Sequence, residues 1–195
     1  DDTVDLGAGS PDGDADVIVL QDGFGNDTIT GGEASELRGD YLVGAGLTGD
    51  ATVDLSAVSA SDSESGTLTM GGDTVTFTEI EAVILGAGND SVIGSSGDDM
   101  VATGGGADTI NTGGGDDMID MGFGDGAADV IVLQDGSGND TLYSFEAPTP
   151  NGDGTFTGTD ALDVTALFDL PLGNPARTPV LTNDVTVTDD GSGNA

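Results

Sequence analysis

Apolar and polar residues repeat with a period of nine from Leu85 onward. Four consecutive blocks read LGAGNDSVI, GSSGDDMVA, TGGGADTIN and TGGGDDMID. Each block has aspartate at its sixth place and one apolar residue at its eighth, namely Val92, Val101, Ile110 and Ile119. One apolar residue at a fixed place in a short segment is typical of a strand that buries a single side chain. Looser fifth and sixth blocks follow, so the pattern predicts a stack of short strands and turns.

The glycines of these blocks predict how the strands are connected. Glycine stands at the fourth place of each block and usually at the second. Glycine accommodates positive φ angles and lets neighbouring backbones approach closely, so the first six residues of a block are predicted to form a tight turn. The last three residues then form the strand. Two blocks complete one flattened coil, so blocks two apart should stack on the same side.

A second repeat relates the two ends of this pattern. The segment ADVIVLQDGFGNDTI (15–29) is nearly identical to ADVIVLQDGSGNDTL (128–142), within a wider likeness of residues 1–32 to 116–142. Self-similarity at two scales is typical of a solenoid, in which each coil buries its apolar face against its neighbours. Residues 2–5 match the last four places of a block that has no glycines, which predicts a chain cut from a longer protein.

The remaining segments carry no nonapeptides. Residues 52–56 alternate like a strand, and residues 67–80 surround a Gly71–Gly72–Asp73 turn, which predicts a hairpin. Residues 33–85 should therefore continue the stack or pack beside it. Glu79 and Glu81 would share one face of a strand. A catalytic pair is conceivable there, but a solvent-exposed face is favoured because acidic residues are rarely buried.

The C-terminal part has a different composition, with five of the six prolines at 148, 150, 171, 175 and 179. A strand followed by a helical turn is predicted at 161–170 and a strand or hairpin at 180–188. Residues 151–154, with Asp160 further on, faintly resemble an EF-hand loop, but without a flanking helix a simple turn is predicted. The predicted segments are 1–32 (first repeat segment), 33–85 (strand and hairpin), 86–146 (main repeats) and 147–195 (β-rich C-terminal part).

The net charge of the chain limits which classes of binding partner are expected. Aspartate and glutamate number 37 against two basic residues, Arg38 and Arg177, which gives a formal net charge of −35. Such a field repels phosphate backbones and anionic membranes, so no nucleic acid and no membrane insertion are expected, and the partner should be a cation. Disorder is disfavoured because 35% of the residues are apolar and periodic. Salt adaptation would not by itself place aspartate every ninth residue.

The residue types present also limit the chemistry. The chain has no cysteine and no histidine, so disulfides, thiol nucleophiles, catalytic triads and zinc sites of the usual kinds cannot be built. We therefore predict that the chain is not an enzyme.

The distance between stacked strands indicates which cation could bind between the turns. Stacked strands lie about 4.8 Å apart, so an ion midway between two stacked turns lies about 2.4 Å from each layer. Calcium takes six to eight oxygen ligands at roughly 2.3–2.6 Å, whereas magnesium requires about 2.1 Å and an octahedron. One turn offers an aspartate and a few carbonyl groups, too few alone, but two stacked turns suffice. We expect several Ca²⁺ ions between turns.

The predicted register pairs the turn at 86–90 with 104–108, and the turn at 95–99 with 113–117. Each series continues, to 122–129 and to 136–140 respectively. The predicted side-chain ligands are Asp90, Asp99, Asp108, Asp117, Asp129 and Asp140, then Asp16 and Asp27 in the first copy. The glycines of the metal turns are Gly86, Gly88, Gly97, Gly104, Gly106, Gly113, Gly115, Gly122, Gly124, Gly136 and Gly138, with Gly7, Gly9, Gly23 and Gly25 in the first copy. Asp98 and Asp116, at the fifth place, should point to solvent.

The blocks resemble the G-G-x-G-x-D-x-U-x nonapeptide of the RTX, or haemolysin-type, calcium-binding β-roll family. The resemblance implies repeats that stay unfolded in a calcium-poor cytosol and fold outside a Gram-negative cell, after type I secretion. The expected fold is all-β: a right-handed parallel β-roll or β-solenoid with calcium-binding turns, interrupted by an irregular β segment and followed by a β-rich C-terminal part. The expected location is extracellular or at the cell surface of a marine or salt-adapted bacterium.

Two roles remain open from the sequence. The first is a structural β-roll of an S-layer, fibre or adhesin, whose partners would be calcium and copies of itself or neighbouring repeats of a long chain. The second is a non-catalytic module of a secreted protease, lipase, alginate epimerase or toxin.

Overall fold

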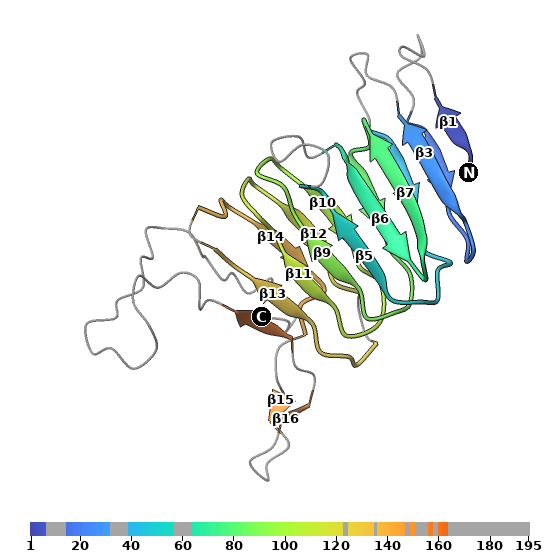
Figure 1. Cartoon of the computed structure of the whole chain (residues 1–195). Helices are drawn as coiled ribbons and strands as arrows, with labels where there is room; N and C mark the ends of the chain where they lie inside the picture. Colours follow the sequence, from blue (N-terminus) through green and yellow to red (C-terminus); the bar gives the residue numbers. More distant parts are fainter. Residues whose placement is uncertain are drawn as a thin grey trace.

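The chain forms a flattened roll of short strands with one β-sheet on each side (Figure 1). The computed structural model describes residues 1–6, 15–31, 39–56, 64–122, 125–134, 136–146 and 160–163, with the backbone of 149–150 and 156–157. These described ranges contain no helix, and hence none long and apolar enough to cross a membrane.

Strands far apart in sequence are neighbours in both sheets. The nine-stranded sheet has the order β1 (Thr3–Asp5), β3 (Asn26–Thr30), β7 (Asp73–Thr78), β6 (Gly66–Met70), β5 (Ala51–Asp54), β9 (Ser91–Ile93), β11 (Thr109–Asn111), β13 (Val130–Val132) and β17 (Ala161–Asp163). The six-stranded sheet has the order β14 (Thr141–Tyr143), β12 (Met118–Asp120), β10 (Met100–Ala102), β8 (Ala82–Ile84), β4 (Tyr41–Val43) and β2 (Val17–Val19). A two-stranded pair, β15 (Thr149–Pro150) and β16 (Phe156–Thr157), stands apart.

The nonapeptide blocks stack two apart, as their spacing predicts. Ser91 pairs with Thr109 across β9 and β11, and Met100 pairs with Met118 across β10 and β12, both in parallel register. Consecutive blocks therefore alternate between the two sheets. The eighth-place residues Val92, Val101, Ile110 and Ile119 point between the sheets and are at most 2% exposed.

The segment between the two copies inserts an antiparallel hairpin into the nine-stranded sheet. β6 and β7 pair around Gly71 and Gly72, as the sequence predicts, and β5 pairs antiparallel with β6 but parallel with β9. β4 and β8 meanwhile continue the six-stranded sheet in parallel. The segment thus continues the stack on one side while changing strand direction on the other.

The expectation that Glu79 and Glu81 share one face of a strand is wrong. β7 ends at Thr78, and Glu79 has a φ of 58°, a left-handed conformation that ends an extended strand. The Glu81 carboxylate is not simply solvent-exposed either, because it accepts a hydrogen bond from the backbone N–H of Asp40.

Part of the C-terminal prediction can be compared with the structure. β17 forms at the start of the strand predicted from residue 161 and pairs in parallel with β13. The turn at 151–154, the helical turn after 163 and the strand at 180–188 lie outside the described residues.

Candidate metal centres in the stacked turns

The turns that precede the strands form two columns, one along each edge of the roll. The first column contains the turns before β9, β11 and β13, which carry Asp90, Asp108 and Asp129. The second column contains the turns before β10, β12 and β14, which carry Asp99, Asp117 and Asp140. Because strands two blocks apart pair in register, equivalent turns lie directly on top of one another.

Within each column the sixth-place aspartates connect successive layers. Asp108 Oδ1 accepts a hydrogen bond from the backbone N–H of Asp90 at 2.8 Å, and Asp129 Oδ1 accepts from Asp108 at 2.8 Å. In the second column Asp117 Oδ1 accepts from Asp99 at 2.9 Å, and Asp140 Oδ1 accepts from Asp117 at 3.2 Å. These four carboxylates therefore bind the turn of the preceding layer, whereas the Asp99 carboxylate accepts hydrogen bonds from Ser95 in its own turn.

The second oxygen of two of these carboxylates has no partner. Oδ2 of Asp108 and Oδ2 of Asp117 are buried without a hydrogen bond, and each residue is only 1% exposed. A buried carboxylate oxygen without a hydrogen-bond donor costs free energy on folding. The negative charge on these two residues therefore requires a nearby positive charge. These two oxygens mark the interior of the first and second columns.

Burial also raises the pKa of the aspartates in both columns. Loss of solvent raises the pKa of Asp117 and of Asp129 from 3.8 to about 7, and neighbouring carboxylates add to the rise. Burial likewise raises the pKa of Asp90 and Asp99 to about 6, against the opposing effect of their backbone hydrogen bonds. The same cause raises the pKa of Asp108 and Asp140. A cation between the turns would offset this desolvation and repulsion.

Backbone carbonyl groups line the space between layers. Gly104 has a φ of 90° and Gly106 a φ of 123°. A Cβ atom added to Gly104 would lie 2.2 Å from the carbonyl oxygen of Gly86, and one added to Gly106 would lie 1.7 Å from that of Gly88. Only glycine therefore permits the layers to approach this closely. The same relation holds in the second column, where Gly115 faces the carbonyl oxygen of Gly97.

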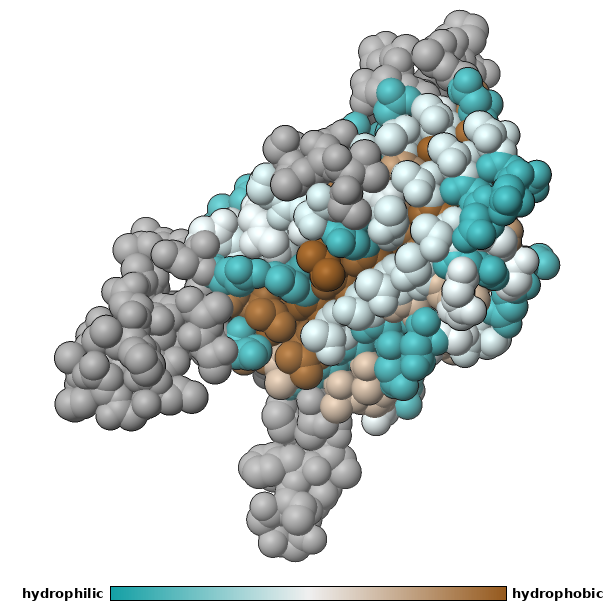
Figure 2. All heavy atoms as spheres, viewed as in Figure 1, coloured by the Kyte–Doolittle hydropathy of each residue, from teal (hydrophilic) through white to brown (hydrophobic). Residues whose placement is uncertain are grey.

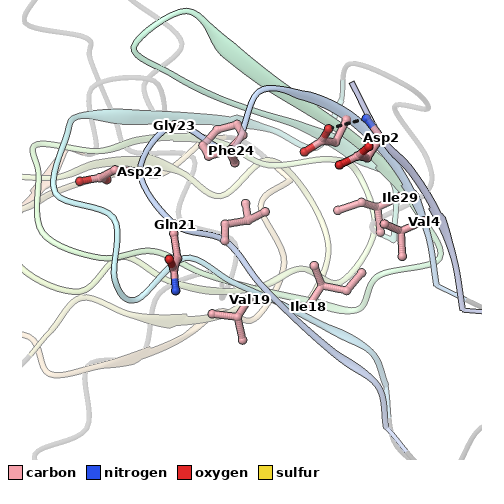
Figure 3. Close-up of a pocket in the computed structure, with 11 residues that line it drawn as sticks. Asp2, Val4, Ile18, Val19, Gln21, Asp22, Gly23, Phe24 and Ile29 are labelled. Carbon is pink, nitrogen blue, oxygen red and sulfur yellow. Dashed lines mark hydrogen bonds between the residues drawn. The ribbon is translucent and has the colours of Figure 1, made fainter.

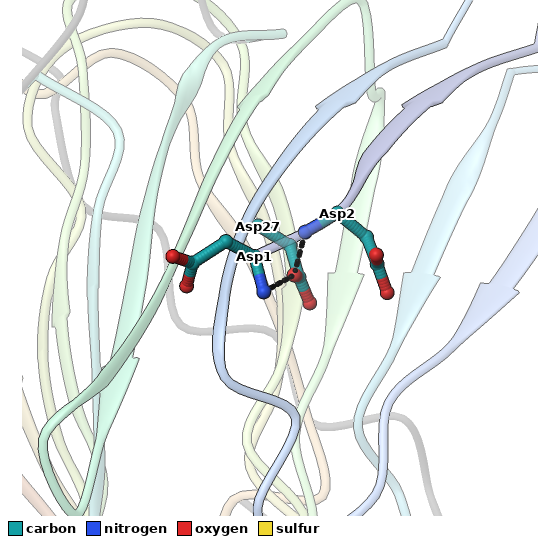
Figure 4. Close-up of polar contacts among 3 residues, drawn as sticks. All are labelled: Asp1, Asp2 and Asp27. Atoms are coloured by element: carbon teal, nitrogen blue, oxygen red, sulfur yellow. Dashed lines mark hydrogen bonds and ion pairs between the residues drawn. The ribbon is translucent and has the colours of Figure 1, made fainter.

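The donor set fits a hard cation. No cluster of three or more acidic side chains that could hold a metal occurs in the described ranges, so carbonyl oxygens must complete any coordination shell. Carboxylate and carbonyl oxygens shared by two layers are the ligands that calcium takes. Neither Arg38 nor Arg177 lies in the described ranges. The one ion pair found there joins the N-terminal amine to Asp27, at 3.8 Å (Figure 4). The residues present thus fit Ca²⁺.

Other predicted turn residues lie as follows. Gly113, Gly122, Gly136 and Gly138 have positive φ angles, as do Gly23 and Gly25, whereas Gly86, Gly88 and Gly97 do not. Gly7, Gly9 and Gly124 lie outside the described residues. Asp98 and Asp116 are exposed, as predicted, and additionally Asp98 Oδ1 accepts a hydrogen bond from the Asp116 N–H at 2.8 Å.

The aspartates of the first copy have partners that the sequence did not identify. Asp27 Oδ1 accepts from the backbone N–H of Asp2 at 2.8 Å (Figure 4). The backbone N–H of Asp16 donates to Asp40 Oδ1 at 2.8 Å. The backbone N–H of Asp40 in turn donates a hydrogen bond to Glu81 Oε2. The second column therefore continues into the irregular segment.

Sequence reasoning missed Asp40, Glu81 and Asp160 as members of the columns. Asp160 is 5% exposed and its two oxygens accept from the N–H groups of Asp129 and Glu146, which completes its hydrogen bonding. Asp40 and Asp160 both begin a D-x-U-x segment with Leu42 or Leu162 at the apolar place. This D-x-U-x segment is the second half of the nonapeptide, and it was the sequence pattern from which Asp40 and Asp160 could have been identified. Glu81 had no such signal.

A cavity of about 440 Å³ opens at the end of the roll formed by β1 and β2 (Figure 3). Its base consists of apolar core side chains, among them Val4, Ile18 and Phe24, and Asp2 and Asp22 lie at its margin. The described lining residues include no pairing of an activated nucleophile with a base.

The family comparison agrees with this geometry. A family model described as the RTX calcium-binding nonapeptide repeat matches four copies, over residues 19–35, 84–119 and 93–131. The chain carries RTX calcium-binding repeats. RTX repeats bind Ca²⁺ as structural modules and occur in proteins secreted by Gram-negative bacteria. No curated protein and no solved structure is detectably similar to the chain. The RTX match excludes residues 39–83, where Asp40 and Glu81 extend the second column.

Proposed function

We propose that this chain is a calcium-dependent structural β-roll of a secreted or cell-surface protein, and that it folds when calcium fills the two columns of turns. The observation that carries the proposal is the pair of buried, unpartnered oxygens on Asp108 and Asp117. The net charge of −35 adds a second reason, because a cation that binds only the folded state offsets the self-repulsion of compaction.

The proposed ligands are the sixth-place aspartates and the carbonyl oxygens of the stacked glycine turns. Bound calcium would supply positive charge between layers. The protein's own residues would position it: the glycines set the approach of the layers, and a backbone N–H of the preceding layer holds one oxygen of the Asp108 and Asp117 carboxylates in place. We propose no catalytic step, since the chain contains neither histidine nor cysteine. A scaffold or adhesive role is the function these features support best.

A calcium titration followed by circular dichroism tests the proposal. We expect a transition from coil to β-structure that a chelator reverses and that magnesium does not reproduce. Asp108→Ala should raise the calcium concentration at the midpoint and remove bound calcium from two interlayer spaces, because its turn has neighbours on both sides. Asp54→Ala is the matched control and should change little, because the Asp54 carboxylate lies outside the two columns and accepts its hydrogen bonds from Ser56 in its own turn. A β-fold that persists in chelator, or equal effects of the two variants, would refute the proposal.

A further inference from the structure

One block of the main series has a side chain where the neighbouring blocks have glycine. Ser95 occupies the second place of its block, whereas Gly86, Gly104 and Gly113 occupy that place in the others. Pale and teal residues, the less hydrophobic ones, predominate on the face of the roll that Figure 2 shows. Ser95 is instead buried, with 5% of its surface exposed. A buried hydroxyl group needs hydrogen-bond partners, so the contacts of Ser95 indicate its role.

The hydroxyl group and the backbone of Ser95 hold the aspartate of their own turn. Ser95 Oγ donates a hydrogen bond to Asp99 Oδ1 at 3.1 Å, and the Ser95 N–H donates to Asp99 Oδ2 at 2.9 Å. The Gly97 N–H donates to Ser95 Oγ at 2.9 Å, which orients the hydroxyl group. Both oxygens of the Asp99 carboxylate therefore have a donor, although this residue is only 3% exposed.

Asp99 differs in this respect from Asp90, the first block aspartate of the other column. Asp90 Oδ1 accepts a hydrogen bond from the Ala51 N–H of the preceding layer at 2.7 Å. In the second column the register of β8 and β10 places Glu81 opposite Asp99. The Glu81 N–H donates to the carbonyl oxygen of Asp40 at 3.1 Å, and the Asp99 oxygens accept from Ser95. Asp90 thus connects two layers, whereas Asp99 is bound within its own turn.

The Ser95 side chain also occupies space that a carbonyl group fills at later turns. A Cβ atom added to Gly104 would lie 2.2 Å from the carbonyl oxygen of Gly86, and one added to Gly113 would lie 2.0 Å from that of Ser95. Real Cβ atoms essentially never come within 3.0 Å of another heavy atom. Because Ser95 has a Cβ atom, no carbonyl oxygen of the preceding layer can lie this close to it. The space before this turn therefore lacks a carbonyl ligand that the later spaces offer.

The next turn of the second column has the opposite properties. Asp117 Oδ2 is buried without a hydrogen-bond partner, and glycine at the second place of its block lets the preceding layer approach. Calcium needs six to eight oxygen ligands, so a space with a free carboxylate oxygen and close carbonyl groups suits it. At the Asp99 turn the carboxylate is already paired and a carbonyl ligand is missing.

We propose that Ser95 takes the place of a calcium ion at the Asp99 turn. The calcium-binding part of the second column then begins one layer later, in the space between the turns of Asp99 and Asp117. The inference rests on the proposed function and removes one aspartate from its set of ligands. Ser95 is a residue that determines which turns bind calcium, because it supplies two donors to a carboxylate that would otherwise require a cation.

Asparagine variants of the two aspartates test the proposal, because asparagine keeps one side-chain oxygen and removes the charge. Bound calcium would be counted by equilibrium dialysis, and folding followed by circular dichroism. Asp117→Asn should bind one ion fewer than the wild type and should raise the calcium midpoint about tenfold, since a charged ligand is lost. Asp99→Asn should bind the wild-type number of ions, with a midpoint within about twofold of the wild-type value.

Loss of an ion in Asp99→Asn, or failure of this variant to fold at calcium concentrations that fold the wild type, would overturn the inference. If neither variant changed the ion count or the midpoint, the proposed function itself would be refuted.

A double-mutant cycle tests the part that the hydroxyl group plays. Ser95→Ala should lower the thermal unfolding midpoint at saturating calcium, because Asp99 loses one of its two donors. The decrease should be smaller in an Asp99→Ala background, where the hydroxyl group has no carboxylate to bind. Equal decreases in the two backgrounds would show that the hydroxyl group acts only through Gly97, and would also overturn the inference.

Discussion

The nonapeptide blocks and the irregular segment between the two copies are stabilised by different means within one roll. Among the described residues, seven of the twelve largest fully buried side chains lie in residues 42–80, including Phe77, Leu47 and Leu68, and five lie in the longer stretch of blocks. Each of the first five blocks buries one valine or isoleucine in its strand and one aspartate at its turn. The irregular segment therefore relies more on apolar burial, and the blocks rely more on what neutralises their carboxylates.

Removal of calcium should have the largest effect and should separate the two regions. Hydrogen exchange followed by mass spectrometry, with and without chelator, would measure it. We expect protection in β9 to β14 to fall to the level of an unfolded chain, while β5 to β7 retain part of theirs because of their apolar contacts. Uniform loss of protection along the chain would show that the two regions form one cooperative unit.

Truncation of an apolar side chain should affect stability without affecting calcium binding. Phe77→Ala removes a side chain that is 0% exposed, and we expect the free energy of unfolding to fall by about 3–5 kcal/mol. Thermal unfolding at saturating calcium would show the loss. The calcium affinity of the folded chain, measured by isothermal titration calorimetry, should stay within twofold. A loss of affinity comparable to that of Asp108→Ala would contradict the distinction between the regions.

A glycine in the blocks offers a smaller and more local test. Gly106→Ala forces alanine into a φ of 123° and places its Cβ 1.7 Å from the carbonyl oxygen of Gly88. The backbone strain alone costs about 1–3 kcal/mol, and the displaced carbonyl should also weaken calcium binding in that layer. Gly105→Ala is the control, since its Cβ would meet nothing closer than Asp125 Oδ2 at 3.5 Å. Equal unfolding midpoints for the two variants would argue against close stacking at this turn.

The smallest expected effect concerns pH. The pKa of Asp117 and Asp129 is about 7 in the folded chain without metal, against 3.8 for an unperturbed carboxyl. Between these values the folded state binds more protons than the unfolded state, so without calcium its stability should rise as pH falls from 8 to 5. Protons compete with calcium for the same oxygens, so the calcium midpoint should rise as pH falls through 7 to 6. A calcium midpoint independent of pH in this range would contradict burial of these groups.

The regular part of the structure was predictable because its signals are local and repeated. The period of nine with inward Val92 and Ile110 predicted both the pairing of blocks two apart and the placement of Asp108 between two neighbours. The hairpin around Gly71 was predictable from its turn residues for the same reason. What the sequence did not reveal depends on distant contacts: β5 pairs with β9 across the 36 residues between Asp54 and Ser91, and no residue pattern near Ala51 predicts this pairing.

Members of the columns outside the blocks were missed for a related reason. Asp40 and Asp160 reach the same positions as the block aspartates without two preceding glycines, so the turn signal was absent. Glu81 was predicted to share a strand face with Glu79 and to face solvent, because acidic residues are rarely buried. The left-handed conformation at Glu79 redirects the chain, and no residue type in this stretch favours it.

Consecutive blocks alternate between the two sheets. Whether an even or an odd number of blocks precedes a strand therefore determines which sheet that strand joins. The hexapeptide ADVIVL occurs at Ala15–Leu20 and again at Ala128–Leu133, yet β2 belongs to the six-stranded sheet and β13 to the nine-stranded sheet. Insertion of a single block before β12 would transfer every later strand to the opposite side, and would carry Met118 from the six-stranded sheet to the nine-stranded sheet. Insertion of two blocks would only lengthen the roll. Gain or loss of two blocks therefore leaves each later strand on its original sheet. Gain or loss of one block moves each later strand to the other sheet.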